Sequence, residues 1–197
     1  MPPQLSLDPV RTAVLSMDLQ TAIVSIYAKD QKGPLLARVA SVLTRARTIG
    51  MRIIHVQVGF RPNLPEASSR NMLLAAIKSS TKHQQLFQGT AGAIHPAVAP
   101  QGNDIVIVKH RVSAFKGTDL EMILRANDID TLVLFGIATS GVVLSTLLDA
   151  ADTDYRLVVI KDCCLDLDPE LHSCLVDKLF PRCATVLSAD DFRGALT

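Results

Sequence analysis

The sequence TLVLFGIATSGVVLSTLLDAAD, residues 131–152, decides the predicted fold of this chain. Residues 132–135 are a short continuous apolar run between polar residues and glycine, which predicts a strand buried on both faces of a parallel sheet. From Gly141 onward apolar residues recur at helical spacing, so an amphipathic helix is expected to end near Asp152. The turn at residues 137–140 therefore joins the carboxyl end of a strand to the start of a helix, where open α/β sheets bind ligands.

Similar apolar runs and amphipathic segments alternate along the rest of the chain. Further strands are predicted at residues 12–17, 52–58, 105–108, 157–160 and 184–187. Helices are predicted at residues 34–48, 69–79, 118–126 and 169–180, and a turn at residues 190–192. This alternation predicts a single α/β domain over residues 1–197, with a parallel sheet covered by helices on both faces.

Composition excludes several classes of function. The net charge is +1 and the basic residues are scattered, so no nucleic-acid or anionic-membrane surface is expected. No apolar run approaches the ~20 residues of a spanning helix, and the polar leader MPPQLSLDP predicts no signal peptide. The four cysteines lack CxxC spacing, which suits neither a disulfide framework nor a zinc site. We expect a cytoplasmic protein that acts on a small molecule without a cofactor.

Residues 59–104 are the least regular part of the chain. Prolines and glycines punctuate them, and a single helical stretch, residues 69–79, lies inside. A segment of this length with little structure is usually a lid or a binding loop. We therefore expect it to be a variable lid or loop segment of the domain, and the sequence leaves open whether it closes a pocket.

Three features with chemical potential follow strands: Asp18, Lys109 and the turn at residues 137–142. In a parallel sheet all three point to the same edge. A carboxylate and an ammonium held together there are able to serve as a proton donor or acceptor and its electrostatic partner. The alternative is structural, with Asp18 capping a loop and Lys109 forming an ordinary ion pair.

Together these residues resemble a known family. Asp18 in LSMDLQ, Lys109 in VKHRVSAFKGTDLEMILRANDID and the stretch LVLFGIATSGVVLSTLLDAADTDY are similar to the isochorismatase-like hydrolase superfamily, which includes nicotinamidases and other cysteine hydrolases. The resemblance extends from about Arg11 to Phe192 and is weakest over residues 59–104. It implies a three-layer α-β-α fold with a six-stranded, mostly parallel sheet, and assembly into dimers or larger homo-oligomers.

The resemblance also implies site residues. Family members with amidase activity use an Asp–Lys–Cys triad, and Asp18 and Lys109 fall on its first two positions. The Ile137–Ala138 bond falls where the family commonly has a cis peptide that shapes an oxyanion hole, so the turn Ile137, Ala138, Thr139, Ser140, Gly141 and Val142 is the expected third component.

The third triad position departs from the family pattern. Val142 occupies the place of the nucleophilic cysteine, and valine has no lone pair with which to form an acyl-enzyme. Ser140 and Thr139 lie in the same turn, but no histidine is evident near them, and helix capping is their commoner role. Cys163 and Cys164 follow a neighbouring strand and remain possible substitutes, although small buried cysteines usually behave as hydrophobes.

The mechanism that we favour is acid–base hydrolysis, which needs no nucleophilic side chain. True isochorismatases cleave a vinyl ether with an aspartic acid as proton donor and water as the attacking species. An Asp18 held protonated by apolar surroundings and tuned by Lys109 predicts the same acid–base hydrolysis here. The alternative is a non-catalytic ligand-binding or scaffold protein that kept the pocket after losing its nucleophile.

Pocket walls and metals complete the predictions. The expected walls of the substrate pocket are Gln20, Tyr27, Phe60, Arg61 and Phe115, with Arg61 able to hold a carboxylate in a bidentate contact. No metal site is expected. His55 is predicted to be mid-strand and core-facing, and His83 and His95 are isolated in the irregular segment.

Overall fold

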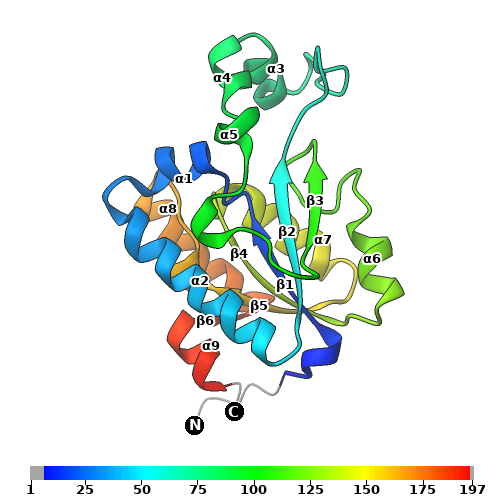
Figure 1. Ribbon diagram of the computed structural model, residues 1–197, viewed down its shortest axis with the longest axis vertical. Coiled ribbons are helices and arrows are strands. Elements are labelled where there is room, and N and C mark those ends of the chain that lie inside the picture. The colour runs from blue at the N-terminus through cyan, green and yellow to red at the C-terminus, as the bar shows by residue number, and fades with distance from the viewer. Residues whose placement is uncertain (1–6, 196–197) are drawn as a thin grey trace.

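A computed structural model of the chain, shown in Figure 1, describes residues 7–195. Within these residues six strands form one sheet in the order β3-β2-β1-β4-β5-β6, and each neighbouring pair is parallel. The strands are β1 (Thr12–Met17), β2 (Arg52–Val58), β3 (Ile105–Lys109), β4 (Thr131–Gly136), β5 (Arg156–Ile160) and β6 (Thr185–Leu187). The predicted α/β fold with a six-stranded parallel sheet is confirmed.

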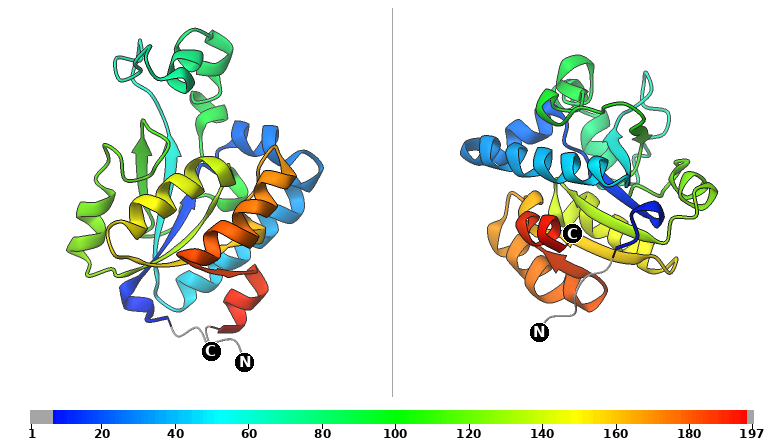
Figure 2. Two further views of the ribbon diagram at one scale, coloured as in Figure 1. Left: turned by 180° about the vertical axis from the view of Figure 1, so that it is seen from behind. Right: turned by 60° about the horizontal axis from the view of Figure 1, so that its bottom comes forward.

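Helices lie on both faces of the sheet. Helix α2 covers one face, and α7 and α8 cover the other, as the opposite views of Figures 1 and 2 show. Helix α9 packs beside α2. The helices are α1 (Thr21–Ala28), α2 (Lys32–Thr48), α3 (Met72–Lys78), α4 (Thr81–Gln85), α5 (Gly89–Gly92), α6 (Leu120–Ala126), α7 (Leu144–Ala151), α8 (Pro169–Cys174) and α9 (Ala189–Ala195).

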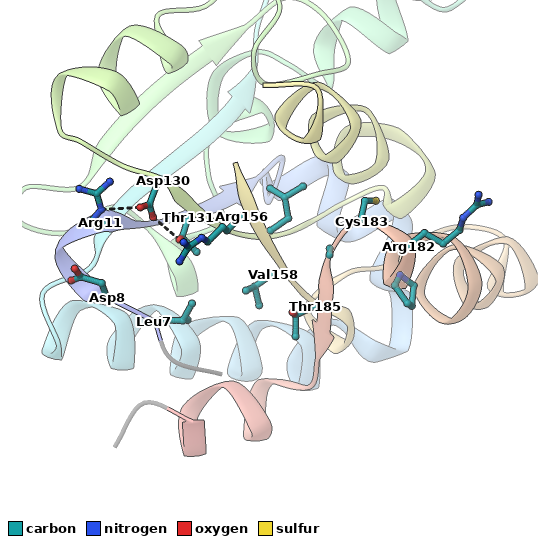
Figure 3. Close-up of a pocket in the computed structure, with 13 residues that line it drawn as sticks. Leu7, Asp8, Arg11, Asp130, Thr131, Arg156, Val158, Arg182, Cys183 and Thr185 are labelled. Carbon is teal, nitrogen blue, oxygen red and sulfur yellow. Dashed lines mark hydrogen bonds and ion pairs between the residues drawn. The ribbon is translucent and has the colours of Figure 1, made fainter. Parts of the chain in front are cut away.

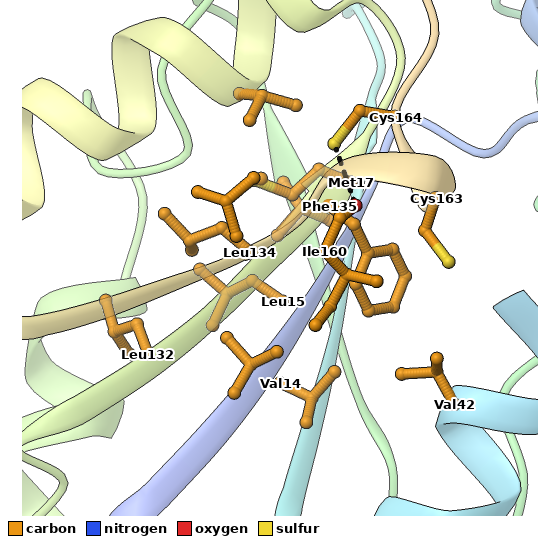
Figure 4. Close-up of a cluster of buried hydrophobic side chains, with 14 of the residues drawn as sticks. Val14, Leu15, Met17, Val42, Leu132, Leu134, Phe135, Ile160, Cys163 and Cys164 are labelled. Carbon is orange, nitrogen blue, oxygen red and sulfur yellow. Dashed lines mark hydrogen bonds between the residues drawn. The ribbon is translucent and has the colours of Figure 1, made fainter. Parts of the chain in front are cut away.

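Burial on both faces explains why the central strands read as continuous apolar runs. Every residue of β1 and β4 is buried. Figure 4 shows Leu15, Phe135 and Ile160, which come from three adjacent strands and belong to one hydrophobic cluster. This dry core holds the strand ends in fixed positions.

Capping side chains account for two differences from the predicted helices. Helix α3 begins at Met72 because the Asn71 side chain accepts a hydrogen bond from the Leu74 N–H, so the predicted span of residues 69–79 is too long. The predicted C-terminal turn is instead helix α9, and near its start the Ser188 hydroxyl oxygen accepts the N–H of Asp191.

Helix α1 and two helices of the irregular segment were not expected. The sequence TAIVSIYA of α1 has apolar Ile26 on its exposed side, which hides the helical period. Residues 59–93, called the cap segment below, hold α3, α4 and α5 where the sequence predicts one helix. Figure 1 shows these helices beyond the carboxyl ends of the strands.

The strand order creates a crevice between β1 and β4. From β1 the chain proceeds to β2 and β3 on one side, and from β4 to β5 and β6 on the other. This is a topological switch point, the usual ligand site of open α/β sheets. Gly136 ends β4 here with φ +150°, and a Cβ on it would lie 2.1 Å from the Met17 carbonyl oxygen. Only glycine allows this close approach of the two strands.

Candidate active site

Asp18 and Lys109 form an ion pair at the carboxyl edge of the sheet. Asp18 directly follows β1, Lys109 ends β3, and β2 lies between the two strands. Lys109 Nζ lies 2.9 Å from Asp18 Oδ2, and neither side chain is more than 9% exposed. Lys109 Nζ also donates to the carbonyl oxygen of Arg111 at 3.0 Å. The sheet thus brings together the two residues that the sequence placed at its edge.

The second carboxylate oxygen of Asp18, Oδ1, is buried and has no hydrogen-bond partner among residues 7–195. Burial raises the pKa of Asp18 above its ordinary value, and the Lys109 ammonium offsets this only in part. A desolvated carboxyl group with one unengaged oxygen retains its proton to higher pH, which suits a proton donor.

A cavity of about 410 Å³ contains this ion pair in its wall. Its volume lies within the range of small-molecule sites, roughly 300–1,000 Å³. Of the predicted pocket walls, Tyr27 and Phe60 line the cavity. Burial, followed by the charges of Asp166 and Asp18, raises the pKa of Tyr27, so its phenol stays protonated.

The turn after β4 forms a second part of the cavity wall. Ile137, Ala138, Gly141 and Val142 line the cavity, and the Ile137–Ala138 peptide bond is cis, as the resemblance implies. From Thr139 to Val143 the chain forms a π-helical turn that leads into α7. Val142 therefore presents a hydrocarbon to the cavity that holds Asp18.

Thr139 and Ser140 belong to the same turn but do not line the cavity. The expectation that no histidine lies near them is wrong, because His172 Nδ1 lies 2.8 Å from Thr139 Oγ1. Thr139 is fully buried, and the Ser140 N–H donates to Asp166 at 2.7 Å. These contacts fix the back of the turn and hold the Thr139 hydroxyl away from the cavity. Nothing local in the sequence signals them, since α8 supplies His172 from far along the chain.

The prediction that Gln20 lines the substrate pocket is wrong. Its side chain is fully buried, with Nε2 donating to the carbonyl oxygens of Val58 at 2.9 Å and Gly92 at 2.6 Å. Its Oε1 accepts the Val58 N–H at 2.8 Å. One amide thus joins the two ends of the cap segment, and all its polar atoms are used in this contact.

Arg61 and Phe115 also lie outside the cavity, contrary to prediction. The Arg61 side chain is 62% exposed and points to Glu66, with the closest approach 3.9 Å. Phe115 packs against Tyr155, with ring centroids 6.1 Å apart. Arg111, which was not among the predicted residues, lines the cavity instead.

Most of the apolar wall comes from residues that sequence reasoning missed. They lie in α1, the cap segment and the loop before α8, and lack a motif that would single them out. They are Ile23, Ile26, Leu73, Leu74, Ala76, Ile77, Leu86, Phe87 and Leu167.

The two cysteines that the sequence offered as possible substitutes for a nucleophile lie outside the cavity. Cys163 and Cys164 are almost completely buried and do not line the cavity. Figure 4 shows both among the apolar side chains at the end of β5. Burial raises the pKa of Cys163 and raises that of Cys164 to about 12, so both stay protonated thiols at neutral pH.

Histidine positions bear on metal binding. In the region that the structure describes, residues 7–195, no three His, Cys, Asp or Glu side chains gather as a metal site requires. His55 is fully buried in β2, as predicted, with Nε2 3.2 Å from Asp104 Oδ2. His83 does line the cavity, with Nδ1 3.2 Å from the Ala76 carbonyl oxygen.

A larger hollow of about 660 Å³ lies at the opposite edge of the sheet (Figure 3). Its rim carries Arg11, Arg156 and Arg182, and Arg11 is paired with Asp130 at 2.8 Å. It opens at the amino ends of the strands, away from Asp18 and the turn after β4. We therefore place the site in the smaller cavity. None of the helices within residues 7–195 is long and apolar enough to span a membrane.

Comparisons with known proteins agree with this geometry. The isochorismatase domain model matches residues 12–191. An uncharacterized isochorismatase family protein, YecD, from Escherichia coli O157:H7 is 30% identical over 194 residues, covering 98% of this chain and 100% of the relative. The ureidoacrylate amidohydrolase RutB from Agrobacterium fabrum is 33% identical over 218 residues, covering 100% of this chain and 94% of that protein.

A solved structure shares the fold along almost the whole chain. An isochorismatase family protein from Burkholderia thailandensis superimposes with a TM-score of 0.82 at 28% identity, covering 97% of each chain. The domain match, the relatives and the shared fold lead to one conclusion. The chain belongs to the isochorismatase family and is a hydrolase of that family.

Proposed function

We propose that this hydrolase acts on a small molecule by acid–base chemistry, with Asp18 as proton donor and Lys109 as its electrostatic partner. The observation that carries the proposal is that the two oxygens of the Asp18 carboxyl group have different surroundings. Asp18 Oδ2 lies 2.9 Å from Lys109 Nζ, while Oδ1 is buried without a partner in the described chain. Both residues line the 410 Å³ cavity. The unengaged oxygen is therefore placed to exchange a proton with a ligand.

A vinyl ether, or a related C–O or C–N bond, suits this arrangement. Asp18 transfers its proton to the terminal alkene carbon, and the π electrons form the new C–H bond. Water then adds to the oxocarbenium carbon and returns a proton to the Asp18 carboxylate. The hemiketal collapses to a ketone and an alcohol, so one water is consumed and the carboxyl group is regenerated. The raised pKa of Asp18 favours the first step.

Val142 argues against covalent catalysis at the turn. A hydrocarbon at this cavity position supplies no nucleophile. RutB is named an amidohydrolase, and a thiol-dependent amidase mechanism does not carry over to Val142. Cytoplasmic location and assembly as a homo-oligomer remain expectations from the sequence.

The test is a panel of vinyl ethers, amides and imides assayed with wild-type protein and Asp18→Asn. We expect Asp18→Asn to lower turnover of the best substrate about a hundredfold to ten-thousandfold, the usual contribution of a general acid. Asp152→Asn, an exposed carboxylate on the far end of α7, is the matched control. Turnover should fall as pH rises through the pKa of Asp18, because only the protonated carboxyl donates.

Two results would overturn the proposal. Full activity of Asp18→Asn contradicts the role of the acid, and loss of activity on cysteine alkylation indicates a thiol mechanism. Binding of panel members without any turnover would favour the non-catalytic ligand-binding alternative.

A further inference from the structure

The cavity wall is polar on one side and apolar on the other. The Asp18–Lys109 pair lies on the sheet side, whereas the cap segment supplies a surface of hydrocarbon and aromatic groups. The ring of Phe60 contacts that of Phe87 edge to face, with centroids 5.4 Å apart, and closes this surface. The other apolar side chains of this wall from the cap segment are Leu73, Leu74, Ala76, Ile77 and Leu86.

Exposed apolar side chains from three separate elements meet at this cavity. Ile26 of α1, Leu73 of α3 and Leu167 of the loop before α8 are 40%, 56% and 56% exposed, and all three line the cavity. Exposed apolar side chains that converge around a concavity mark a surface that a ligand covers. These three side chains are not part of the hydrophobic core of the sheet.

The strongest positive charges at the cavity are already engaged. Lys109 is paired with Asp18 at 2.9 Å. The Arg111 guanidinium donates to the carbonyl oxygens of His110 at 2.7 Å and Glu66 at 3.1 Å. A ligand carboxylate would have to compete with these contacts.

The two imidazoles at the cavity also have backbone contacts. His83 Nδ1 lies 3.2 Å from the Ala76 carbonyl oxygen, and His110 Nδ1 lies 2.6 Å from that of Gly59. The His83 ring is thereby held within the cap segment, and the His110 ring is held against the start of that segment. The wall thus favours an uncharged ligand.

Hydrogen bonds from Gln20 and Thr21 hold the two ends of the cap segment, and with them the apolar wall. The Gln20 amide binds Val58, just before the cap segment, and Gly92, near its end. The Thr21 N–H adds a bond to the Ala93 carbonyl oxygen at 2.9 Å. A wall anchored at both ends is preformed, which lowers the entropy lost when a ligand packs against it.

We infer that the substrate carries an uncharged apolar body, at least the size of a six-membered ring, which packs against the cap segment while its reactive bond lies at Asp18. This inference rests on the proposed function for the orientation of the substrate. The preference for an apolar, uncharged body is a property of the wall and is measured by binding alone.

The experiment is calorimetric titration with acetophenone, acetone and benzoate. The two ketones differ only in phenyl against methyl, and benzoate keeps the ring but carries a charge. We expect acetophenone to bind about tenfold more tightly than acetone, because the ring buries more apolar surface. We also expect it to bind about tenfold more tightly than benzoate, because Lys109 and Arg111 are already engaged and the benzoate carboxylate would lose its hydration. Equal affinity for both ketones, tighter binding of benzoate, or no binding of acetophenone up to its solubility limit would overturn the inference.

Neighbouring residues of α3 provide matched variants. Leu73→Asn should weaken acetophenone binding about fivefold and leave acetone unchanged, since Leu73 lines the cavity. Met72→Asn is the control, because Met72 is 89% exposed and lies outside the cavity wall. Equal effects of the two variants would overturn the inference. Asp18→Asn should keep the preference for acetophenone over acetone, so the wall and the acid are tested separately.

Discussion

The sheet body and the cap segment contribute to one cavity but are stabilised in different ways. The body has one continuous core that includes four of the six residues of β1 and four of the six residues of β4. The buried cluster of the cap segment comprises only Leu64, Ala67 and Leu74, and its longest helix has seven residues. Helices this short are not stable alone. The cap segment therefore depends on its attachment to the body.

This difference fits the roles that we propose for the two regions. The proposed proton transfer requires Asp18 and Lys109 to stay within hydrogen-bond distance, and rigid strand ends provide that precision. An apolar wall needs area and shape more than exact angles, because hydrophobic contact is not directional. The sheet body thus holds the polar groups in fixed positions, and the cap segment provides the apolar surface.

A Leu→Ala substitution in each region should give the largest difference in the free energy of unfolding. Leu15→Ala in the fully buried β1 should lower the free energy of unfolding by about 2–5 kcal/mol. Leu64→Ala in the small cluster should lower it by less than about 1 kcal/mol, since the cap segment opens locally without unfolding the sheet. Urea unfolding followed by circular dichroism measures both, and equal losses would show that the two regions form one cooperative unit.

Gln20→Leu should loosen the cap segment specifically. It removes all three hydrogen bonds of the amide and leaves the Val58 N–H without its partner, a local cost of about 2 kcal/mol. Amide hydrogen exchange in residues 59–93 should accelerate severalfold more than exchange in β4. Ser25→Ala on exposed α1 is the control, because its hydroxyl contacts only its own helix. Unchanged exchange in Gln20→Leu would refute the anchoring role.

Lys109→Met should shift the pH dependence of activity. The ammonium lowers the pKa of Asp18 against the effect of burial, so its removal raises that pKa further. If protonated Asp18 is the active form, the fall in turnover at high pH moves to higher pH in the variant. A pH–rate profile of both proteins measures the shift, and a shift to lower pH would contradict the acid role.

A smaller effect should come from His55 in the body. Burial lowers its pKa in the folded state, despite the hydrogen bond to Asp104. The unfolded chain therefore binds a proton more readily below about pH 6.5. Stability should fall as pH drops from that value towards the folded pKa, at no more than about 1.4 kcal/mol per pH unit. His55→Asn should reduce this slope in urea unfolding, and an unchanged slope in the variant would contradict the role of His55.

Much of the fold was predictable because strands that are buried on both faces appear in the sequence as continuous apolar runs. Residues 132–135 and 12–17 are apolar at every or almost every position because helices cover both sides of the sheet. The meeting of Asp18 and Lys109 followed from the parallel direction of the strands. Helix α1 left no such mark, because its outer side is apolar and serves the cavity.

The pocket walls were much less predictable. Gln20, Arg61 and Phe115 have suitable chemistry and lie near the expected site in sequence, yet none lines the cavity. Gln20 is used to join the ends of the cap segment, and Phe115 packs against Tyr155. Such outcomes depend on partners distant in sequence, which a local pattern does not reveal.

By itself, the sequence determined the parallel α/β sheet and the acid and ammonium at its edge, because these follow from residue type and periodicity; the match of Val142 to the nucleophile position is what the family resemblance implies. Tertiary structure alone decided that Asp18 Oδ1 has no partner among the described residues, that His172 binds Thr139, and that the cap segment supplies the apolar wall. The physical reason is that burial, partner choice and pKa depend on atoms brought together across the whole chain.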